Sequence, residues 1–286
     1  GGPRAEYERD REGNLTRARL GEAEVTVEYD ALRRRQRVRY GQAASAEYAY
    51  DGEGRVQAVT VRNAAGQPLV SARYGWDTAG RLASTEVDGR RIEYAYDAAG
   101  RLAAAKLPDG SRREYAYDRG ASLIQAGPAR FDLDAAGRPT RLREAGAETA
   151  IAWGPAGRLA ETRAGAAVTR YVFAGEDLTR VELPGQAGVE YHYDGEGNLV
   201  GRSEGRDSVR YLIDGRSLAA EMGPDGRARS IYLDGDRLDE HLARLHEGQP
   251  QYYVTDPNLS VLAVLDARGR VLTRYSTLDA VEDEIL

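Results

Sequence analysis

The sequence predicts an all-β protein built as a repeat array of antiparallel β-hairpins. The prediction rests on a strand-turn-strand unit at residues 94–102, on its recurrence along the chain, and on a second type of hairpin turn between the units. Tyr94 and Tyr96 alternate with other residues, so both rings point to one face of a sheet. Asp97 then opens a type I turn, and Gly100 can adopt the positive φ that closes it with a bulge.

The same unit recurs at a spacing of about twenty residues, which is typical of a repeat architecture. In each unit an aspartate caps the turn, and a glycine often follows three residues later. The turn residues are Asp51, Gly54, Asp77, Gly80, Asp97, Gly100, Asp118, Asp134, Gly137, Asp194, Gly197, Asp214, Asp234 and Asp256. The unit weakens at residues 131–180, where Gly154 and Gly175 stand near the aspartate position, so an Asx-type hydrogen bond is not expected there.

Aromatic residues precede most of these turns and predict an aromatic ladder on one face of the sheet. Its residues are Tyr48, Tyr50, Tyr74, Trp76, Tyr94, Tyr96, Tyr115, Tyr117, Tyr191 and Tyr193. Between the units lie Asp-Gly and Pro-Asp-Gly turns, at Asp88-Gly89 and at residues 108–110, which are typical of hairpins. The strands are therefore expected to follow one another in a continuous twisted ribbon without helices.

The repeated Tyr-x-Tyr-Asp…Gly-Arg-Leu unit resembles the Rhs/YD-repeat family. That family includes bacterial polymorphic toxins, the C component of insecticidal Tc toxins, and teneurins. The resemblance extends from about Tyr7 to Tyr275 and implies a ribbon of hairpins that spirals into a hollow barrel or shell. Residues 1–235 are assigned to the hairpin array, and residues 236–286 to a closing segment similar to the end of the Rhs core.

The closing segment departs from the family pattern in one turn. Asn258-Leu259 stand where the family has a Leu-Gly-Ser-like turn, and Asn258 is expected to take the left-handed conformation in place of glycine. The family's self-cleaving aspartates lie in a D-P-x-G segment downstream of the core. Because Asp256-Pro257 belongs to the closing repeat, no protease role is transferred to this pair.

Composition excludes several other classes of protein. The net charge is −6 with both signs interspersed, so no basic stripe for nucleic acid is expected. There is no cysteine for a disulfide or thiolate site. No apolar run is long enough for a membrane span, and no signal peptide is recognisable at the start. The arginine run at residues 33–37 is interpreted as outward strand positions, with contact to an anionic partner as the alternative.

Candidate chemistry in the sequence is sparse. Residues 201–205 match G-x-S-x-G around Ser203, but no helix pattern follows, so a glycine-rich turn at a hairpin end is the preferred interpretation over a nucleophile elbow. His192, His241 and His246 are the only histidines, and their spacing does not favour zinc. The repeated aspartates are interpreted as turn caps and not as Ca²⁺ ligands. No catalytic, cofactor or metal residue is expected.

The resemblance implies a structural function. The chain is expected to be a shell segment, about one turn of the spiral, of a secreted bacterial Rhs-type toxin that encloses or presents a C-terminal toxin or cargo domain. A secreted or cell-surface location follows from this expectation. The alternatives are a surface module that binds carbohydrate or protein, and a hydrolase built on Ser203. Strands at the two ends of the array are edges through which the chain can self-associate.

Overall fold

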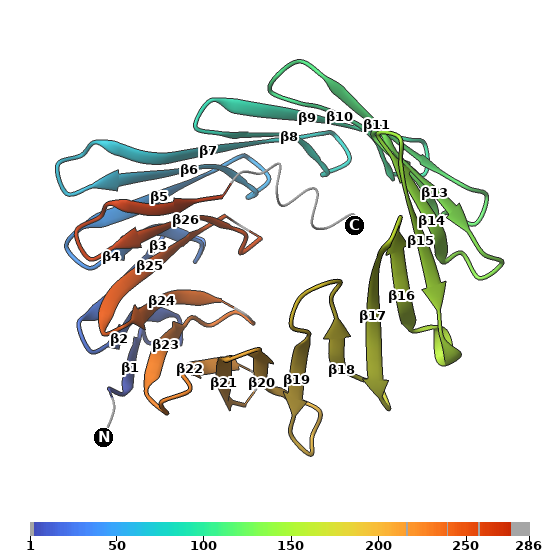
Figure 1. The fold of residues 1–286 in the computed structure, drawn as a ribbon. Coiled ribbons are helices and arrows are strands. Elements are labelled where there is room, and N and C mark those ends of the chain that lie inside the picture. Colours follow the sequence, from blue (N-terminus) through green and yellow to red (C-terminus); the bar gives the residue numbers. More distant parts are fainter. Residues whose placement is uncertain (1–2, 216, 239, 257, 276–286) are drawn as a thin grey trace. The chain divides into compact units, whose positions relative to one another are not determined.

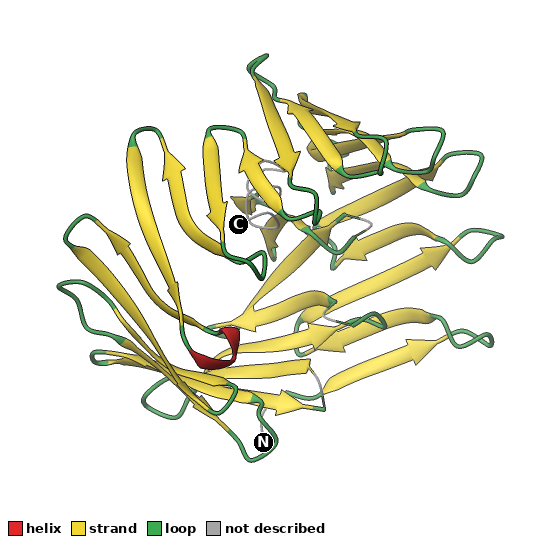
Figure 2. Ribbon diagram, turned by 90° about the vertical axis from the view of Figure 1, so that its right-hand side faces the viewer, coloured by secondary structure: helices red, strands yellow, loops and turns green. Residues whose placement is uncertain are grey.

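The computed structural model describes residues 3–215, 217–238, 240–256 and 258–275. In this part of the chain, one 27-stranded sheet accounts for the fold, and consecutive strands pair antiparallel. The only helical element among the described residues is η1 (Pro155–Gly157), a single 3-10 turn in the weakened part of the repeat (Figure 2). The prediction of an all-β array of antiparallel hairpins is confirmed.

The chain divides into two compact units. The first contains the described residues of Gly1–Glu93, Leu212–Met222 and Arg227–Leu286, and the second contains Tyr94–Tyr211 and Gly223–Gly226. The strands that begin the chain are β1 (Ala5–Arg9), β2 (Leu15–Leu20), β3 (Ala23–Tyr29), β4 (Arg35–Tyr40), β5 (Ala44–Tyr50), β6 (Val56–Asn63), β7 (Pro68–Trp76), β8 (Leu82–Val87) and β9 (Arg90–Tyr96).

The second unit continues the same series of hairpins. Its strands are β10 (Leu102–Lys106), β11 (Arg112–Tyr117), β12 (Leu123–Ala126), β13 (Ala129–Leu133), β14 (Pro139–Glu144), β15 (Ala147–Trp153), β16 (Leu159–Ala164), β17 (Ala167–Ala174), β18 (Asp177–Glu182), β19 (Val189–Tyr193), β20 (Leu199–Glu204) and the first part of β21 (Asp207–Asp214), up to Tyr211. The remaining strands are β22 (Ser217–Met222), β23 (Ala228–Asp234), β24 (His241–His246), β25 (Gln249–Thr255), β26 (Val261–Asp266) and β27 (Val271–Arg274).

The first unit has a hydrophobic core between two strips of the sheet. Strands β23–β26, orange to red in Figure 1, lie beside the blue strands β2–β5, and β3 contacts both β24 and β25. The period-two pattern explains the packing, because one face of β3 contributes Ala23, Val25 and Val27. These residues pack in one cluster with Leu233 and Leu265 of the C-terminal strip, both fully buried. The small side chains of Ala23, Val25 and Val27 allow the two strips to pack face to face.

An aromatic pair lies in the same core. Tyr40 of β4 and Tyr252 of β25 are almost fully buried, and their ring centroids lie 5.9 Å apart in a tilted arrangement. Such tilted contacts are favourable beyond the area that they bury. The closing segment is therefore attached to the first strands of the chain through apolar packing over a long sequence separation.

Register shifts recur where strands lead into the Asp turns. They fall between Ala49 and Tyr50, Gly75 and Trp76, and Ala152 and Trp153. A bulge at this place adds one residue to the strand that follows the turn, namely Gln57, Ala83 or Ala160. Such a bulge increases the local twist of the ladder.

Two expectations about the backbone were wrong. At the turn after β25, Leu259 and not Asn258 has the left-handed conformation, with φ of 69°. Leu259 occupies the position that Gly100 has in the unit at residues 94–102. The turn geometry therefore overrides the preference of leucine for negative φ. The G-x-S-x-G stretch is not simply a turn, because Gly201 and Ser203 lie within β20 and only Gly205 has positive φ.

Candidate functional site

The Asp turn is the functional unit that this chain repeats, and residues 97–102 show its geometry. Asp97 Oδ1 accepts the backbone N–H groups of Ala99 and Arg101, each at 2.9 Å. Arg101 Nε donates to Asp97 Oδ2 at 2.8 Å. The turn is closed by the N–H of Gly100, which donates to the Asp97 carbonyl at 3.0 Å, with Gly100 at a φ of 83°.

Several turns are also fastened to the hairpin that follows them. The Arg101 guanidinium lies 4.4 Å from the ring centroid of Tyr117, and the Tyr117 hydroxyl donates to the Leu102 carbonyl at 3.0 Å. Cation–π contact and a neutral hydrogen bond thus act on one ring. We call this arrangement the staple. It recurs with the pairs Arg34 and Tyr50, Arg55 and Trp76, and Arg138 and Trp153.

The staple varies where the repeat unit weakens. Gly154 provides no carboxylate, and Phe173 has no donor, so only the contact of Arg158 with the Phe173 ring, at 5.8 Å, remains. In the turn after β19, Asn198 replaces arginine and donates its side-chain N–H to Asp194 Oδ2 at 2.9 Å. The cap is therefore retained there by an uncharged partner.

The structure places the remaining predicted turn residues in several environments. Asp51, Asp77 and Asp134 accept hydrogen bonds as Asp97 does, and Asp118 accepts the N–H of Ser122. Asp214 ends β21 and Asp234 ends β23, and the Asp234 carboxylate contacts His241 Nδ1 at 2.6 Å. Asp256 caps its turn through the N–H groups of Asn258 and Ser260. Glycines Gly54, Gly80, Gly137 and Gly197 all have positive φ.

The predicted ladder residues differ in burial. Tyr74 and Tyr115 are buried, whereas Tyr48, Trp76, Tyr94, Tyr96 and Tyr191 are half-buried. The Tyr193 hydroxyl donates to the Leu178 carbonyl at 3.1 Å, which is the hydrogen bond of the staple. The sequence interpretation missed the role of the arginines in these staples. The Asp-x-x-Gly-Arg spacing, which places the arginine four residues after the carboxylate, was the signal that could have revealed it.

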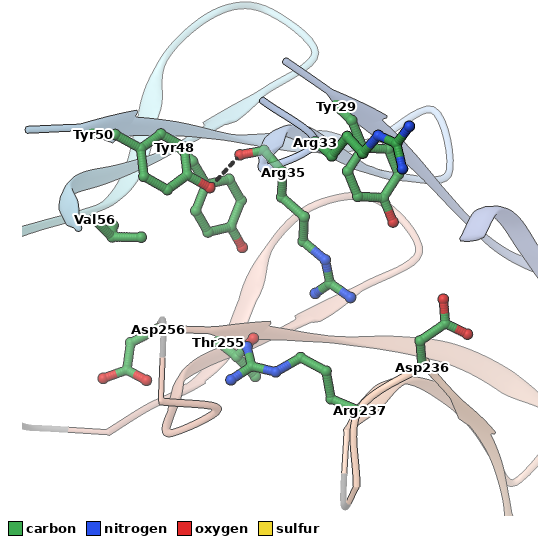
Figure 3. A pocket seen from close by; sticks show the side chains of 10 residues that line it. All are labelled: Tyr29, Arg33, Arg35, Tyr48, Tyr50, Val56, Asp236, Arg237, Thr255 and Asp256. Atoms are coloured by element: carbon green, nitrogen blue, oxygen red, sulfur yellow. Dashed lines mark hydrogen bonds between the residues drawn. The ribbon is translucent and has the colours of Figure 1, made fainter. Parts of the chain in front are cut away.

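A second candidate site lies between the two strips of the first unit. It is a cavity of about 320 Å³ whose lining includes Tyr29, Tyr48 and Tyr50 from the N-terminal strip and Asp236 and Asp256 from the C-terminal strip (Figure 3). Burial raises the pKa of the Tyr48 hydroxyl to about 12. Burial also raises the pKa of Asp256, against the lowering effect of its two backbone donors.

A buried ion pair joins the strips next to this cavity. Arg35 Nη1 and Nη2 donate to the two carboxylate oxygens of Glu240, the second at 2.9 Å, and the Glu240 side chain is 1% exposed. Burial alone would lower the pKa of Arg35, but the hydrogen bonds and charge of Glu240 raise it. The interpretation of the arginine run as outward positions is therefore wrong for Arg35. The register between β3 and β4 shifts between Glu28 and Tyr29, and Arg35 is the ladder partner of Tyr29.

Further polar contacts hold the same two strips together. Asp236 accepts hydrogen bonds from the guanidinium of Arg9 at 2.6 Å and from the N–H of Leu15 at 3.2 Å. Arg274 contacts both the Asp88 carboxylate and the Leu69 carbonyl. Ion pairs within the protein thus neutralise charges between the two strips, which indicates a structural role for these contacts.

Candidate chemistry elsewhere is limited among the described residues. No group of three or more His, Asp or Glu side chains is arranged to hold a metal ion in the part of the chain that the structure covers. No helix there is long and apolar enough to cross a membrane. His192 Nε2 and Ser203 Oγ lie 3.2 Å apart on neighbouring strands, a contact that the sequence interpretation did not anticipate.

The fold and its repeated turn define a hairpin-repeat protein, and comparison with known proteins identifies the repeat. Residues 76–112 match the RHS Repeat family. The matched segment therefore carries an RHS repeat, in agreement with the resemblance of the sequence to the Rhs/YD-repeat family. No curated protein matches the sequence.

Solved structures of similar fold extend the comparison to almost the whole chain. The structure of TcdB2-TccC3-TEV has a TM-score of 0.59 at 17% identity and covers 95% of this chain. Those of TcdB2-TccC3-Cdc42 and TcdB2-TccC3 each have a TM-score of 0.56, at 15% and 17% identity, with the same coverage. This chain matches only 16% to 17% of the length of those chains.

Replacing Gly100 with valine is expected to lower the free energy of unfolding by about 1–3 kcal/mol, because a β-branched residue resists positive φ. Urea denaturation of the variant and the parent protein measures the difference. Ala98→Val in the same turn is the matched control, since Ala98 does not have positive φ. Equal stability of the two variants would contradict the assigned role of Gly100.

The Asp caps are expected to make stability fall in acid. Hydrogen bonds from the backbone and side chain of Arg101 hold the pKa of Asp97 below its usual value. Its contribution is therefore present above the unfolded pKa of about 3.9 and is lost as the pH falls through the folded pKa. Asp256 has a raised pKa, so its ionisation lowers the stability of the folded protein as the pH rises. NMR titration of the two carboxyl carbons measures both values. A midpoint of Asp97 at or above that of Asp256 would contradict this assignment.

Proposed function

We propose that this chain is a wall segment of a YD-repeat shell, which encloses or presents a polypeptide carried by the same parent protein. The observation that supports the proposal best is the stapling of turns to following hairpins, which occurs within each of the two units. Such a chain has nearest-neighbour contacts throughout and suits an extended wall better than a catalytic scaffold. The role proposed is structural and not enzymatic.

The ladder face of the second unit supports a contact with another polypeptide. In the first unit this face is covered by the C-terminal strip and forms the hydrophobic core. In the second unit, Tyr171, Phe173, Tyr191 and Tyr193 remain half-buried. Rows of half-buried aromatic rings provide apolar area for an extended or partly folded chain. We propose that a C-terminal toxin or cargo domain of the parent protein is the partner of this face.

Within this proposal, residues 236–286 close the array that residues 1–235 begin. The buried contacts of Leu233, Leu242 and Leu265 with the first strands support such a closing role. Secretion or display at the cell surface follows from enclosing a toxin. Strands β1 and β27 each have one ladder partner among the described residues, so self-association through these edges is part of the proposal.

Small-angle X-ray scattering of the isolated chain tests the shell role. A hollow or open-curved profile is expected, whereas a compact solid particle would defeat the proposal and favour a surface module that binds carbohydrate or protein. Cargo is tested separately on the full-length parent protein. Co-purification of a cleaved C-terminal polypeptide is the expected result. Esterase activity that is lost in Ser203→Ala would instead favour a hydrolase.

A further inference from the structure

A second cavity, of about 380 Å³, lies within the second unit on the ladder formed by β19, β20 and β21. Gly223, Pro224 and Gly226 complete its lining. His192 alternates with Tyr191 and Tyr193 along β19, so it lies on the face opposite the aromatic ladder. Gly201, Ser203, Ser208 and Arg210 share this face by register. These side chains are therefore separate from the face proposed to contact cargo.

Gly201 forms the floor of this cavity. It stands opposite His192 in the ladder between β19 and β20. A Cβ atom at this position would lie 3.2 Å from the Val209 carbonyl oxygen and 3.5 Å from His192 Cδ2. The φ of Gly201 is not positive, so the backbone does not require glycine here. The absence of a side chain instead leaves room beside the His192 ring.

The polar side chains around this floor can all donate hydrogen bonds. His192 Nε2 lies 3.2 Å from Ser203 Oγ, and Ser203 stands directly opposite Ser208 in the ladder between β20 and β21. Arg210 stands opposite Gly201 in the same ladder. Hydroxyl, imidazole and guanidinium groups converge from three strands, which is the arrangement that binds a charged acceptor.

No carboxylate is among the described residues that line this cavity. Arg210 has no ion-pair partner within the described part of the chain. The carboxylate of Glu204, on the neighbouring strand, lies 4.0 Å from the guanidinium of Arg202. Glu190, opposite Ser203, has its carboxylate 3.8 Å from Arg180. In the first unit, by contrast, Arg35 is matched by Glu240.

We propose that this cavity binds the sulfate or phosphate monoester group of a sugar-sized molecule. The unpaired guanidinium of Arg210 and the hydroxyls of Ser203 and Ser208 provide charge-assisted hydrogen bonds to a tetrahedral oxyanion. The volume exceeds that of a bare oxyanion, and Pro224 offers apolar surface for the carbon body of the ligand. This site is independent of the shell role.

The test uses the complete 286-residue chain and its three histidines. Glucose 6-sulfate, glucose 6-phosphate and glucose are titrated separately at constant ionic strength, and the ring Cε1–H signals are followed by NMR. His192→Gln identifies the signal of His192. We expect this signal to shift saturably, with a dissociation constant below about 1 mM, for one or both esters and not for glucose. The two esters distinguish sulfate from phosphate as the source of the oxyanion.

Two variants and one control decide the assignment. Arg210→Gln is expected to weaken binding about tenfold by removing the cationic donor, and Gly201→Val is expected to abolish binding by filling the floor. Arg170→Gln, on β17 and outside the lining, should bind as the parent protein does. Circular dichroism checks that each variant is folded. Equal shifts of all three histidines, no saturation, or unchanged binding by folded Gly201→Val would overturn the proposal.

Discussion

Replacing Glu240 with alanine is expected to lower the free energy of unfolding of the first unit by about 3–5 kcal/mol. The carboxylate is 1% exposed and accepts two hydrogen bonds from Arg35. Its removal leaves the Arg35 guanidinium in a largely buried place without a counter-charge. Urea denaturation followed by the fluorescence of Trp76, which lies in the same unit, measures the loss.

The exposed pair of Arg37 and Glu47 provides the matched control. Their side chains are 37% and 49% exposed, and Glu47→Ala is expected to cost about 1 kcal/mol or less. The double variant Arg35→Met/Glu240→Leu should recover most of the lost stability, because neither charge then remains buried. If Glu240→Ala and Glu47→Ala destabilise equally, the ion pair does not hold the strips together.

Replacing Leu265 with alanine is expected to cost about 2–5 kcal/mol, through lost apolar transfer and the cavity left behind. Leu265 is fully buried in β26 and packs in the cluster that includes Val25 and Val61 of the N-terminal strip. The loss should therefore destabilise strands at both ends of the chain. Denaturation of the variant, followed by Trp76 in a Trp153→Phe background, measures it.

Leu272→Ala on the neighbouring strand is the control, since Leu272 is 48% exposed and its truncation should change stability by about 0.5 kcal/mol or less. The chain has two tryptophans, one in each unit. In the reciprocal Trp76→Phe background, Trp153 is expected to report a smaller shift for Leu265→Ala. An unchanged Trp76 transition in the first background would refute the packing of the two strips.

The hairpins could be predicted from the sequence because their determinants are local. Asp97, Gly100 and the alternating tyrosines lie within one short segment, and backbone chemistry alone determines what such a segment can form. The aspartate to arginine pairing was also within reach, since the two residues are four positions apart in every strong unit. The wrong assignment at Asn258 shows the limit of this reasoning, because Leu259 is forced into the left-handed region by the turn it belongs to.

The two cavities could not be predicted from the sequence for a different reason. Arg35 and Glu240 are separated by 205 residues, and no local pattern indicates which arginine of the run points inward. His192 and Ser203 are close only because the register between β19 and β20 places Gly201 opposite His192. A shift of one residue would move these side chains to the opposite face. Such sites depend on register and strip-to-strip packing, which short-range turn chemistry does not specify.

The staple imposes an order on synthesis at the ribosome. Arg101 contacts the ring of Tyr117, and the hydrogen bond of that ring spans 15 residues. Such a staple can form as soon as the next hairpin, β10 and β11, has emerged. Contacts of such short separation form rapidly. The core of the first unit is different, because Val25 can pack against Leu265 only after residue 265 has been synthesised. The earliest strands are therefore the last to be covered, and their apolar face is the part of the nascent chain most exposed to aggregation or to chaperones.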